Sequence, residues 1–219
     1  MSTFDKNAVE ESIRLKERWG GDVTIITVGK TEARKTIKEA LAMGGDRGCL
    51  VVLAGSDPHD TLSVSYFIAR ATEKFGPFDL LLCAEGSSDM YTGQVGPMLS
   101  EWLNLPFIGY VRKLEVDGGL LVRCEQTLED EIRVTEARLP AIVSVVSEIN
   151  EPRYPTLIQI MQASKKPVQE VSSEALVDER KPPTSSVTTI EIAASVTSRK
   201  RVIFEGSAEE TSKKLLMAL

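Results

Sequence analysis

The stretch VTIITVGKTEARKTIKEALAMGGDRGCLVVL, residues 23–53, decides the fold. Residues 23–28 are a short run rich in β-branched side chains, which predicts a strand. Thr31 can cap a helix that stops at Gly44, and residues 49–53 form a second apolar run. Neither run alternates apolar with polar residues, so both strands are expected to be buried on two faces. The helix between them predicts a parallel, right-handed crossover.

The same alternation of strands and helices extends to both sides of this stretch. An amphipathic helix is expected first, at residues 5–19, where Gly20 stops it. Further strands are expected at residues 79–83 and 107–110, and further helices at residues 61–74 and 93–104. This order predicts an α/β fold with a doubly wound, mostly parallel sheet.

From Lys113 onward the hydrophobic period changes to two, which is typical of antiparallel strands. The turn Asp117-Gly118-Gly119 separates the first two of these strands. The expected strands are KLEV at 113–116, LLVRCEQ at 120–126, EIRVTEA at 131–137 and AIVSVV at 141–146. We therefore expect antiparallel strands added to the parallel sheet.

The chain after Asn150 loses this order. Residues 181–186 (KPPTSS) predict an extended polar linker, and residues 187–193 alternate like an edge strand. Residues 207–219 predict a helix that begins with a Ser-x-x-Glu capping box. Such a tail cannot bury a core of its own. We expect a nucleotide-binding α/β domain at 1–168 and an extended C-terminal arm at 169–219 that packs on a partner subunit.

Composition and charge restrict the function of these 219 residues. Hydrophobic residues make up 42% and charged residues 26%, which is typical of a soluble globular protein. The net charge of -6 argues against nucleic-acid binding, which needs a basic face. No run approaches the roughly 18 apolar residues of a membrane span, and the first residues do not form an export signal. A cytoplasmic location without membrane insertion is expected.

The residue types that support metal or nucleophilic chemistry are sparse. Cys49, Cys83 and Cys124 are isolated and predict reduced thiols rather than a disulfide or a metal site. The single histidine, His59, lies in a polar stretch and is expected in a loop. We predict neither a metal centre nor catalytic residues.

Two strand ends suit ligand binding, because ligands of open α/β sheets sit beyond the carboxyl ends of the strands. The first is Val28-Gly29, and the second is AEGSSDMYTGQVGP at residues 84–97. Free backbone N–H groups and the helix dipole at residues 92–94 would favour a phosphate, and Asp89 could accept from a sugar hydroxyl. On spacing alone, the loop could equally be a plain connection.

Four stretches carry a resemblance to a known family. DMYTGQVGPML at 89–99 resembles the nucleotide-binding loop of electron transfer flavoprotein beta subunits. FDKNAVEESIRLKE at 4–17 and ALAMGGDR at 40–47 are similar to that family in the same order. LPA at 139–141, leading to NEPRYPTLIQIMQASKKP at 150–167, resembles its signature segment.

The resemblance implies a Rossmann-like fold, similar to that of the adenine nucleotide alpha hydrolases. It also implies a heterodimer whose alpha subunit carries FAD and whose beta subunit binds AMP. Electrons arrive from flavin dehydrogenases and leave to an acceptor. The chain is then an electron carrier rather than an enzyme, because the cofactor performs the redox chemistry.

The resemblance also assigns residues. The nucleotide contacts fall on Phe4, Val28, Gly29, Ala84, Asp89, Thr92, Gly93, Gln94 and Val95. The recognition loop at 150–167 would dock onto a dehydrogenase through Glu151, Arg153, Tyr154, Pro155, Leu157, Ile160 and Met161, with Leu157 as the apolar anchor. Leu157 and its neighbours could instead pack on their own domain. Glu125 matches a carboxylate near the flavin interface, although a solvated strand carboxylate would look the same.

Two departures from the family pattern change the expectation for the nucleotide. Family members have a strand and an Asp-containing loop ahead of the segment that begins at Phe4, so without them we expect exposed sheet edges and weak AMP binding. Glu85 stands where the family has a lysine near the phosphate, which disfavours an anion. Two alternatives stay open: an electron-bifurcating type with a second FAD in this subunit, and a free-standing adenine-nucleotide sensor.

Overall fold

The computed structural model describes residues 1–53, 60–177, 190, 191, 193 and 201–218. The expected loop at His59, the linker at 181–186 and most of the edge strand expected at 187–193 lie outside the described residues. The chain divides into two compact units, Met1–Thr188 and Thr189–Leu219.

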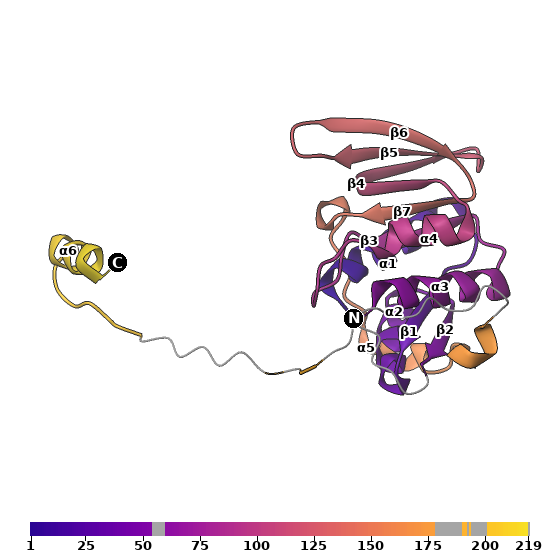
Figure 1. Ribbon diagram of the computed structural model, residues 1–219, viewed down its shortest axis with the longest axis horizontal. Coiled ribbons are helices and arrows are strands. Elements are labelled where there is room, and N and C mark those ends of the chain that lie inside the picture. Colours follow the sequence, from indigo (N-terminus) through magenta and orange to yellow (C-terminus); the bar gives the residue numbers. More distant parts are fainter. Residues whose placement is uncertain (54–59, 178–189, 192, 194–200, 219) are drawn as a thin grey trace. The chain divides into compact units, whose positions relative to one another are not determined.

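The first unit alternates helices and strands over most of its length (Figure 1). Its helices are α1 (Thr3–Trp19), α2 (Arg34–Met43), α3 (Thr61–Phe75), α4 (Val95–Leu103) and α5 (Leu157–Ala163). Its strands are β1 (Thr24–Gly29), β2 (Arg47–Val52), β3 (Leu80–Ala84), β4 (Phe107–Asp117), β5 (Leu121–Thr127), β6 (Ile132–Arg138), β7 (Ala141–Val145) and β8 (Val168–Ser172). Short 3-10 turns lie at Thr31–Ala33, Ser147–Ile149 and Ser173–Leu176.

The strands form two sheets, of which the first has the order β1-β2-β8 and is parallel throughout. The second has the order β3-β7-β4-β5-β6. Within it, β7 pairs in parallel with both β3 and β4, whereas β5 pairs antiparallel with β4 and β6. The mostly parallel arrangement is confirmed, and so are antiparallel strands at β4, β5 and β6. The expectation for residues 141–146 was wrong: β7 is parallel to both of its neighbours, because it inserts between β3 and β4 and is buried throughout.

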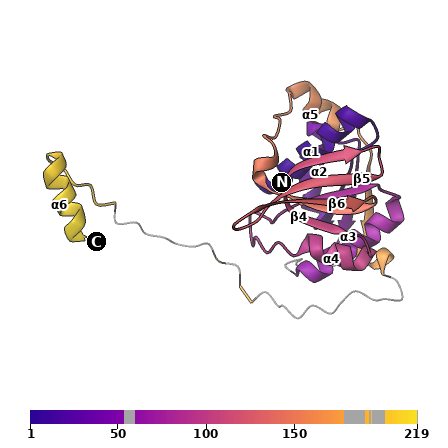
Figure 2. The ribbon, with the colours of Figure 1, turned by 90° about the horizontal axis from the view of Figure 1, so that it is seen from above.

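Helices pack on both sides of the parallel strands, as a doubly wound fold requires. Figure 2 shows α1, α2 and α5 on one side of the strands and α3 and α4 on the other. The helix α1 packs against β3 and β7, and α2 packs against β1 and β2. On the opposite face α3 contacts β1 and β2, while α4 contacts β7 and β4.

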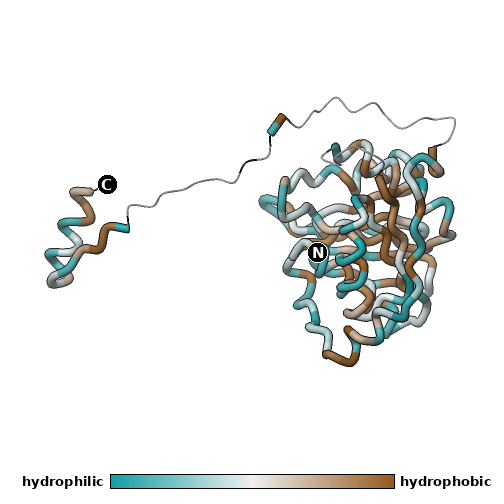
Figure 3. Tube along the Cα trace, turned by 90° about the horizontal axis from the view of Figure 1, so that it is seen from below, coloured by the Kyte–Doolittle hydropathy of each residue, from teal (hydrophilic) through white to brown (hydrophobic). Residues whose placement is uncertain are grey.

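The strands carry the core of this unit, and hydrophobic residues run through its interior in Figure 3. Every residue of β7 is buried, and Ile142 and Val143 have no exposed surface. In β2, Leu50 and Val51 are equally buried between α2 and α3. The strands β1 and β3, which each pair with a single strand in the described part of the chain, are half-buried except at Gly29.

Three details differ from the sequence expectations. The segment after Lys30 begins as a 3-10 turn, and α2 starts only at Arg34, with Ala33 rather than Thr31 at its N-cap position. The strand expected at 107–110 and the one expected from Lys113 are one strand, β4, which is interrupted by an irregularity near Tyr110 (φ +56°). This irregularity lets β4 leave its parallel partner β7 and continue as half of a hairpin.

The third difference concerns the boundary expected after residue 168. Residues 168–172 form β8, which pairs with β2, and Leu176 is buried in the cluster around Val51 and Tyr66. The chain up to Leu176 therefore contributes to the first sheet and its core. In the second unit, helix α6 (Ala208–Ala218) has the predicted capping box, since Ser207 and Glu210 exchange backbone and side-chain hydrogen bonds.

Candidate functional site

The parallel strands β3 and β7 end side by side and define one edge of the second sheet. Ala84 of β3 pairs with Val145 of β7, and the N–H of Glu85 donates to the carbonyl of Val145 at 3.0 Å. The loop at residues 85–94 and the segment that follows β7 therefore leave the sheet at the same edge. Ligands of open α/β sheets bind at such an edge.

The loop at residues 85–94 lies against the N-terminus of α1. The hydroxyls of Ser2 and Ser88 share a hydrogen bond of 2.9 Å, and the N–H of Thr3 donates to the Ser88 hydroxyl at 3.3 Å. The ring of Phe4 lies 5.1 Å from the ring of Tyr91. The structure thus brings Phe4 to the loop that the sequence assigned to the same site.

Two glycines are required by the close packing of this loop. Gly93 has φ +64°, and a Cβ there would lie 3.2 Å from the carbonyl oxygen of Glu85 and 3.8 Å from the hydroxyl of Tyr110. A Cβ on Gly86 would lie 2.7 Å from the ring of Tyr91. Three aromatic side chains, those of Phe4, Tyr91 and Tyr110, therefore gather around the loop.

The helix α4 begins at the end of this loop with Val95, and Gln94 makes no side-chain cap hydrogen bond. The Gln94 side chain instead accepts from the Thr61 hydroxyl at 2.8 Å, which ties the loop to the start of α3. Thr92 and Asp89 are exposed, and the Asp89 carboxylate accepts from the N–H of Met90. Uncapped N–H groups at a helix N-terminus are the main-chain donors that suit an anion.

The predicted nucleotide residues come from both sheets. Phe4, Ala84, Asp89 and residues 92–95 lie on α1, β3, the loop and the start of α4. Val28 and Gly29 end β1 in the other sheet, where Gly29 packs closely on Ala33 and its carbonyl accepts from the N–H of Leu53.

Acidic groups surround the N-terminus of α1. Burial, together with the charge of Asp89, raises the pKa of Asp5 to about 6, although the chain's amino terminus acts in the opposite direction. Partial burial and a hydrogen bond to Glu85 raise the pKa of Tyr91 above its usual value. A half-buried carboxyl with a raised pKa beside a ligand edge is a common feature of functional sites.

The second predicted site is the segment at 150–163, which contains α5. Thr156 and Gln159 form a capping box that starts the helix. Most of its side chains face solvent: exposure is 92% at Tyr154, 74% at Leu157, 67% at Ile158, 51% at Ile160 and 65% at Met161. In this chain Leu157 does not pack on its own domain. Ala163, which is buried, joins the end of α5 to α2.

The other residues assigned to docking lie just before α5. Glu151 is exposed, Pro155 is half-buried, and Arg153 points its guanidinium at α1, where it pairs with Glu10 and Glu17. Arg153 thus holds the segment against its own domain.

Glu125 lies on β5, outside both the loop at residues 85–94 and the segment at residues 150–163. It forms ion pairs with Arg112 and Lys113, both at 3.4 Å. Despite partial desolvation, these cations hold the pKa of Glu125 below its usual value. A strand carboxylate paired in this way is already satisfied within the chain.

The cysteines are free thiols. Burial raises the pKa of Cys49 to about 11 and that of Cys124 to about 12, so neither forms a thiolate near neutral pH. Within residues 1–53, 60–177 and the described parts of the tail, no group of three His, Cys, Asp or Glu side chains could hold a metal ion. No helix in those same residues is long and apolar enough to cross a membrane.

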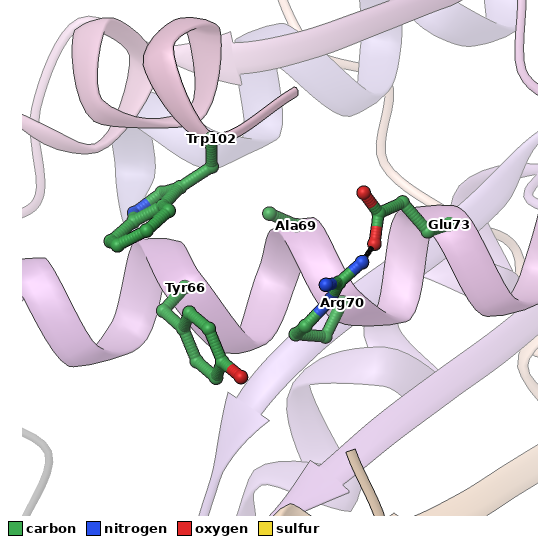
Figure 4. Close-up of a pocket in the computed structure, with 5 residues that line it drawn as sticks. All are labelled: Tyr66, Ala69, Arg70, Glu73 and Trp102. Atoms are coloured by element: carbon green, nitrogen blue, oxygen red, sulfur yellow. Dashed lines mark ion pairs between the residues drawn. The ribbon is translucent and has the colours of Figure 1, made fainter. Parts of the chain in front are cut away.

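Figure 4 shows a small pocket away from the strand edge, between α3 and α4. It is lined by Tyr66, Ala69, Arg70, Glu73 and Trp102, and Arg70 and Glu73 form an ion pair. The Trp102 indole donates to the Ser65 hydroxyl at 3.1 Å, and its ring packs edge-on against Tyr66. The pocket is a seam in the packing of two helices rather than part of the candidate site.

Comparison of the sequence with known proteins identifies the family. The sequence model of the electron transfer flavoprotein domain matches residues 1–176, which places the chain in that class of protein. The chain is 36% identical over 219 residues to the electron transfer flavoprotein subunit beta of Thermoanaerobacterium thermosaccharolyticum, covering 98% of this chain and 84% of that one.

Two further relatives carry the same name. The Bacillus subtilis protein is 34% identical over 220 residues, covering 100% of this chain and 85% of the relative. The Clostridium acetobutylicum protein is 37% identical over 165 residues, covering 75% and 63%. This chain belongs to the electron transfer flavoprotein beta subunit family, so the resemblance seen in the sequence is confirmed.

Sequence reasoning missed several residues of the site. Ser88 and Tyr91 lie inside the predicted loop, but their contacts with α1 depend on segments about 85 positions apart. Tyr110 was expected in a regular strand. Ile158 continues the exposed apolar surface of α5, and the run of apolar letters after Thr156 was the available signal.

Asp5 gives a testable pH dependence. Because its pKa is raised in the folded chain, folding favours the protonated form, and stability is lost as the pH rises from about 4 through 6. Asp5→Asn should therefore raise the free energy of unfolding by about 2 kcal/mol at pH 7.5 and leave it unchanged near pH 4. Urea unfolding at both pH values measures the difference.

The matched control for this prediction is Asp130→Asn, since Asp130 is exposed in the turn between β5 and β6. It should change the stability equally little at both pH values. A wild-type stability advantage over Asp5→Asn at pH 7.5 would show that the Asp5 carboxylate is not disfavoured by burial.

Proposed function

We propose that this chain is the nucleotide-holding and docking half of a heterodimeric electron transfer flavoprotein. An FAD held together with an alpha subunit carries electrons from flavin dehydrogenases to an acceptor, and this chain supplies the surface that selects the dehydrogenase. The proposed location is the cytoplasm. The observation that supports the proposal best is the exposed apolar surface of α5 within a member of this family.

The exposed surface of α5 suits a transient protein contact. Leu157, Ile158 and Met161 are each at least 65% exposed, within a helix that a capping box starts and that α2 supports. Leaving several large apolar side chains in water has a free-energy cost, which contact with a partner removes. A few such anchors can dominate an interface.

The loop at residues 85–94 supports the nucleotide part of the proposal. It offers the uncapped N-terminus of α4, close aromatic rings and the exposed Thr92 and Asp89. AMP would place its phosphate on main-chain N–H groups near Gly93 to Val95 and its adenosine near Phe4. In this role the chain binds AMP and docks onto the dehydrogenase, and the FAD performs the redox chemistry when bound.

Co-expression with a flavin-carrying alpha subunit tests the proposal as a whole. We expect a one-to-one pair to co-purify with one FAD per pair, measured by absorbance against protein, and to bind added AMP. Two flavins per pair would favour the electron-bifurcating alternative. A chain that stays alone or pairs only with itself would favour the nucleotide sensor and contradict the proposal.

Gly93→Val tests the placement of the nucleotide. Valine at φ +64° is strained, and its side chain would push against the carbonyl of Glu85, so the main-chain donors would move. We expect AMP affinity of the purified pair, measured by calorimetry, to fall at least tenfold, a change of about 1.4 kcal/mol.

The matched control for Gly93→Val is Gly118→Val, because Gly118 also has positive φ (+55°) but has nothing within 4 Å of its added Cβ. That variant should retain the wild-type affinity for AMP. An unaltered affinity in Gly93→Val would place the nucleotide elsewhere.

Leu157→Ala tests the docking surface. Truncating Leu157, which is 74% exposed, should raise the KM of a flavin dehydrogenase for the pair severalfold without releasing flavin, because the side chain is buried only in the docked complex. Steady-state reduction of the pair by the dehydrogenase measures this. Leu120→Ala is the control, since Leu120 is 75% exposed in the β4–β5 turn. Equal KM values for both variants would remove the anchor role.

A further inference from the structure

The segment that leads to α5 has neither helix nor strand structure over residues 150–156. It follows the 3-10 turn after β7 and reaches α5 across one face of α1. A segment that lacks the regular main-chain hydrogen bonds of a helix or sheet depends on side-chain contacts for its position. Its contacts with α1 therefore decide where the apolar side chains of α5 are presented.

The face of α1 beneath this segment is a buried polar stripe. Asn7, Glu10 and Glu11 recur at helical spacing and are 5%, 2% and 9% exposed. Three adjacent buried polar residues on a surface helix are unusual, since polar groups lose hydration unless they are paired.

Each of these three side chains has partners in the segment or just before it. The Asn7 amide donates to the carbonyls of Ser147 and Asn150, at 3.1 and 2.8 Å. The Asn150 amide donates back to the Asn7 carbonyl and to the Glu11 carboxylate, both at 3.0 Å. The first residue of the segment is thereby fixed on α1 by reciprocal bonds.

Arg153 fixes the middle of the segment. Its Nε donates to Glu10 Oε2 at 2.8 Å, its second guanidinium nitrogen donates to Glu10 Oε1 at 3.1 Å, and its backbone N–H donates to Glu10 Oε2 at 3.2 Å. The same guanidinium donates to both oxygens of Glu17, at 2.6 and 3.0 Å. A planar fork that binds two carboxylates fixes both the distance and the direction of its backbone.

We propose that Glu10, Glu17 and Arg153 form a positioning clamp that holds the segment on α1 and so presents α5 to the docking partner. This inference rests on the proposed docking function of α5. Glu10 is the informative member, because its side chain is 3% exposed and lies beneath Arg153. It cannot touch a partner protein, so any effect of Glu10 on docking must act through the segment.

Arg14 Nε also donates to Glu10 Oε1 at 2.8 Å. A second guanidinium nitrogen of Arg14 donates to the carbonyl of Glu151. Burial favours the neutral form of Glu10, but the hydrogen bonds from Arg153 and Arg14 outweigh it and hold the pKa of Glu10 below its usual value. The clamp is therefore charged throughout the neutral range. A buried carboxylate with two arginines is costly to disturb on one side only.

The first test is amide hydrogen exchange of the complete heterodimer with Glu10→Gln. Glutamine keeps the shape but removes the charge that orients Arg153, so exchange in residues 150–163 should accelerate severalfold while the strands stay protected. Glu136→Gln, which removes an ion-paired carboxylate from β6, is the matched control and should leave residues 150–163 unchanged. Unchanged exchange in Glu10→Gln overturns the clamp, whatever α5 binds.

The second test is kinetic. Glu10→Gln and Arg153→Lys should raise the KM of the flavin dehydrogenase for the pair severalfold and leave kcat and flavin content near wild type, although the unfolding midpoint falls because one side of a buried ion pair is disturbed. Lysine at position 153 keeps the positive charge of arginine but lacks the planar fork that binds two carboxylates. Arg153→Lys should therefore not retain the wild-type KM. A fall in kcat with loss of flavin would show a general folding role instead.

A double-mutant cycle separates this inference from the proposed function. If the clamp acts by positioning the anchor, the double variant with Glu10→Gln and Leu157→Ala should raise KM by less than the product of the two single-variant fold-changes. A displaced Leu157 contributes less to docking, so its removal then has a smaller effect. Strict additivity overturns the positioning role. If Leu157→Ala alone is silent, the docking function fails, and the exchange experiment still decides whether the clamp exists.

Discussion

The structure depends on the placement of β7 between β3 and β4. This five-residue strand is buried throughout and pairs in parallel with both neighbours, although it follows them in sequence after two antiparallel strands. Parallel pairing points its carboxyl end the same way as that of β3. The loop after Ala84, which we propose binds the nucleotide, and the segment after Val145, which we propose docks onto a partner, consequently start from adjacent positions.

The helix α1 lies over that shared edge and contacts both segments. Its first turn meets the loop through Ser88 and Tyr91, and its middle holds residues 147–153 through Asn7 and Glu10. The opposite side of the helix is apolar, with Val9 and Ile13 packed against α2. One helix thus supports the loop at residues 85–94 at its first turn and, further along, the segment that leads to the exposed apolar surface of α5.

The sequence predicted what local patterning controls. Continuous apolar runs correctly predicted parallel strands, period-two alternation predicted β5 and β6, and Ser207 with Glu210 predicted a capping box. It could not predict the strand order, because the insertion of β7 is set by contacts between distant segments. The irregularity at Tyr110 follows from that insertion, since β4 must leave β7 before it can pair with β5.

The polar stripe of α1 shows the same limit at the level of side chains. Asn7, Glu10 and Glu11 look like a solvated helix face in the sequence, and only the apolar rows of the helix could be interpreted. The structure buries that face because Asn150 and Arg153, more than 130 residues later, supply complementary donors. A charged residue at a helical spacing acquires its role from the chain that covers it, and the covering segment here is the one that ends in the exposed surface of α5. The predicted docking residue Arg153 therefore faces inward, and the apolar residues beyond it face solvent.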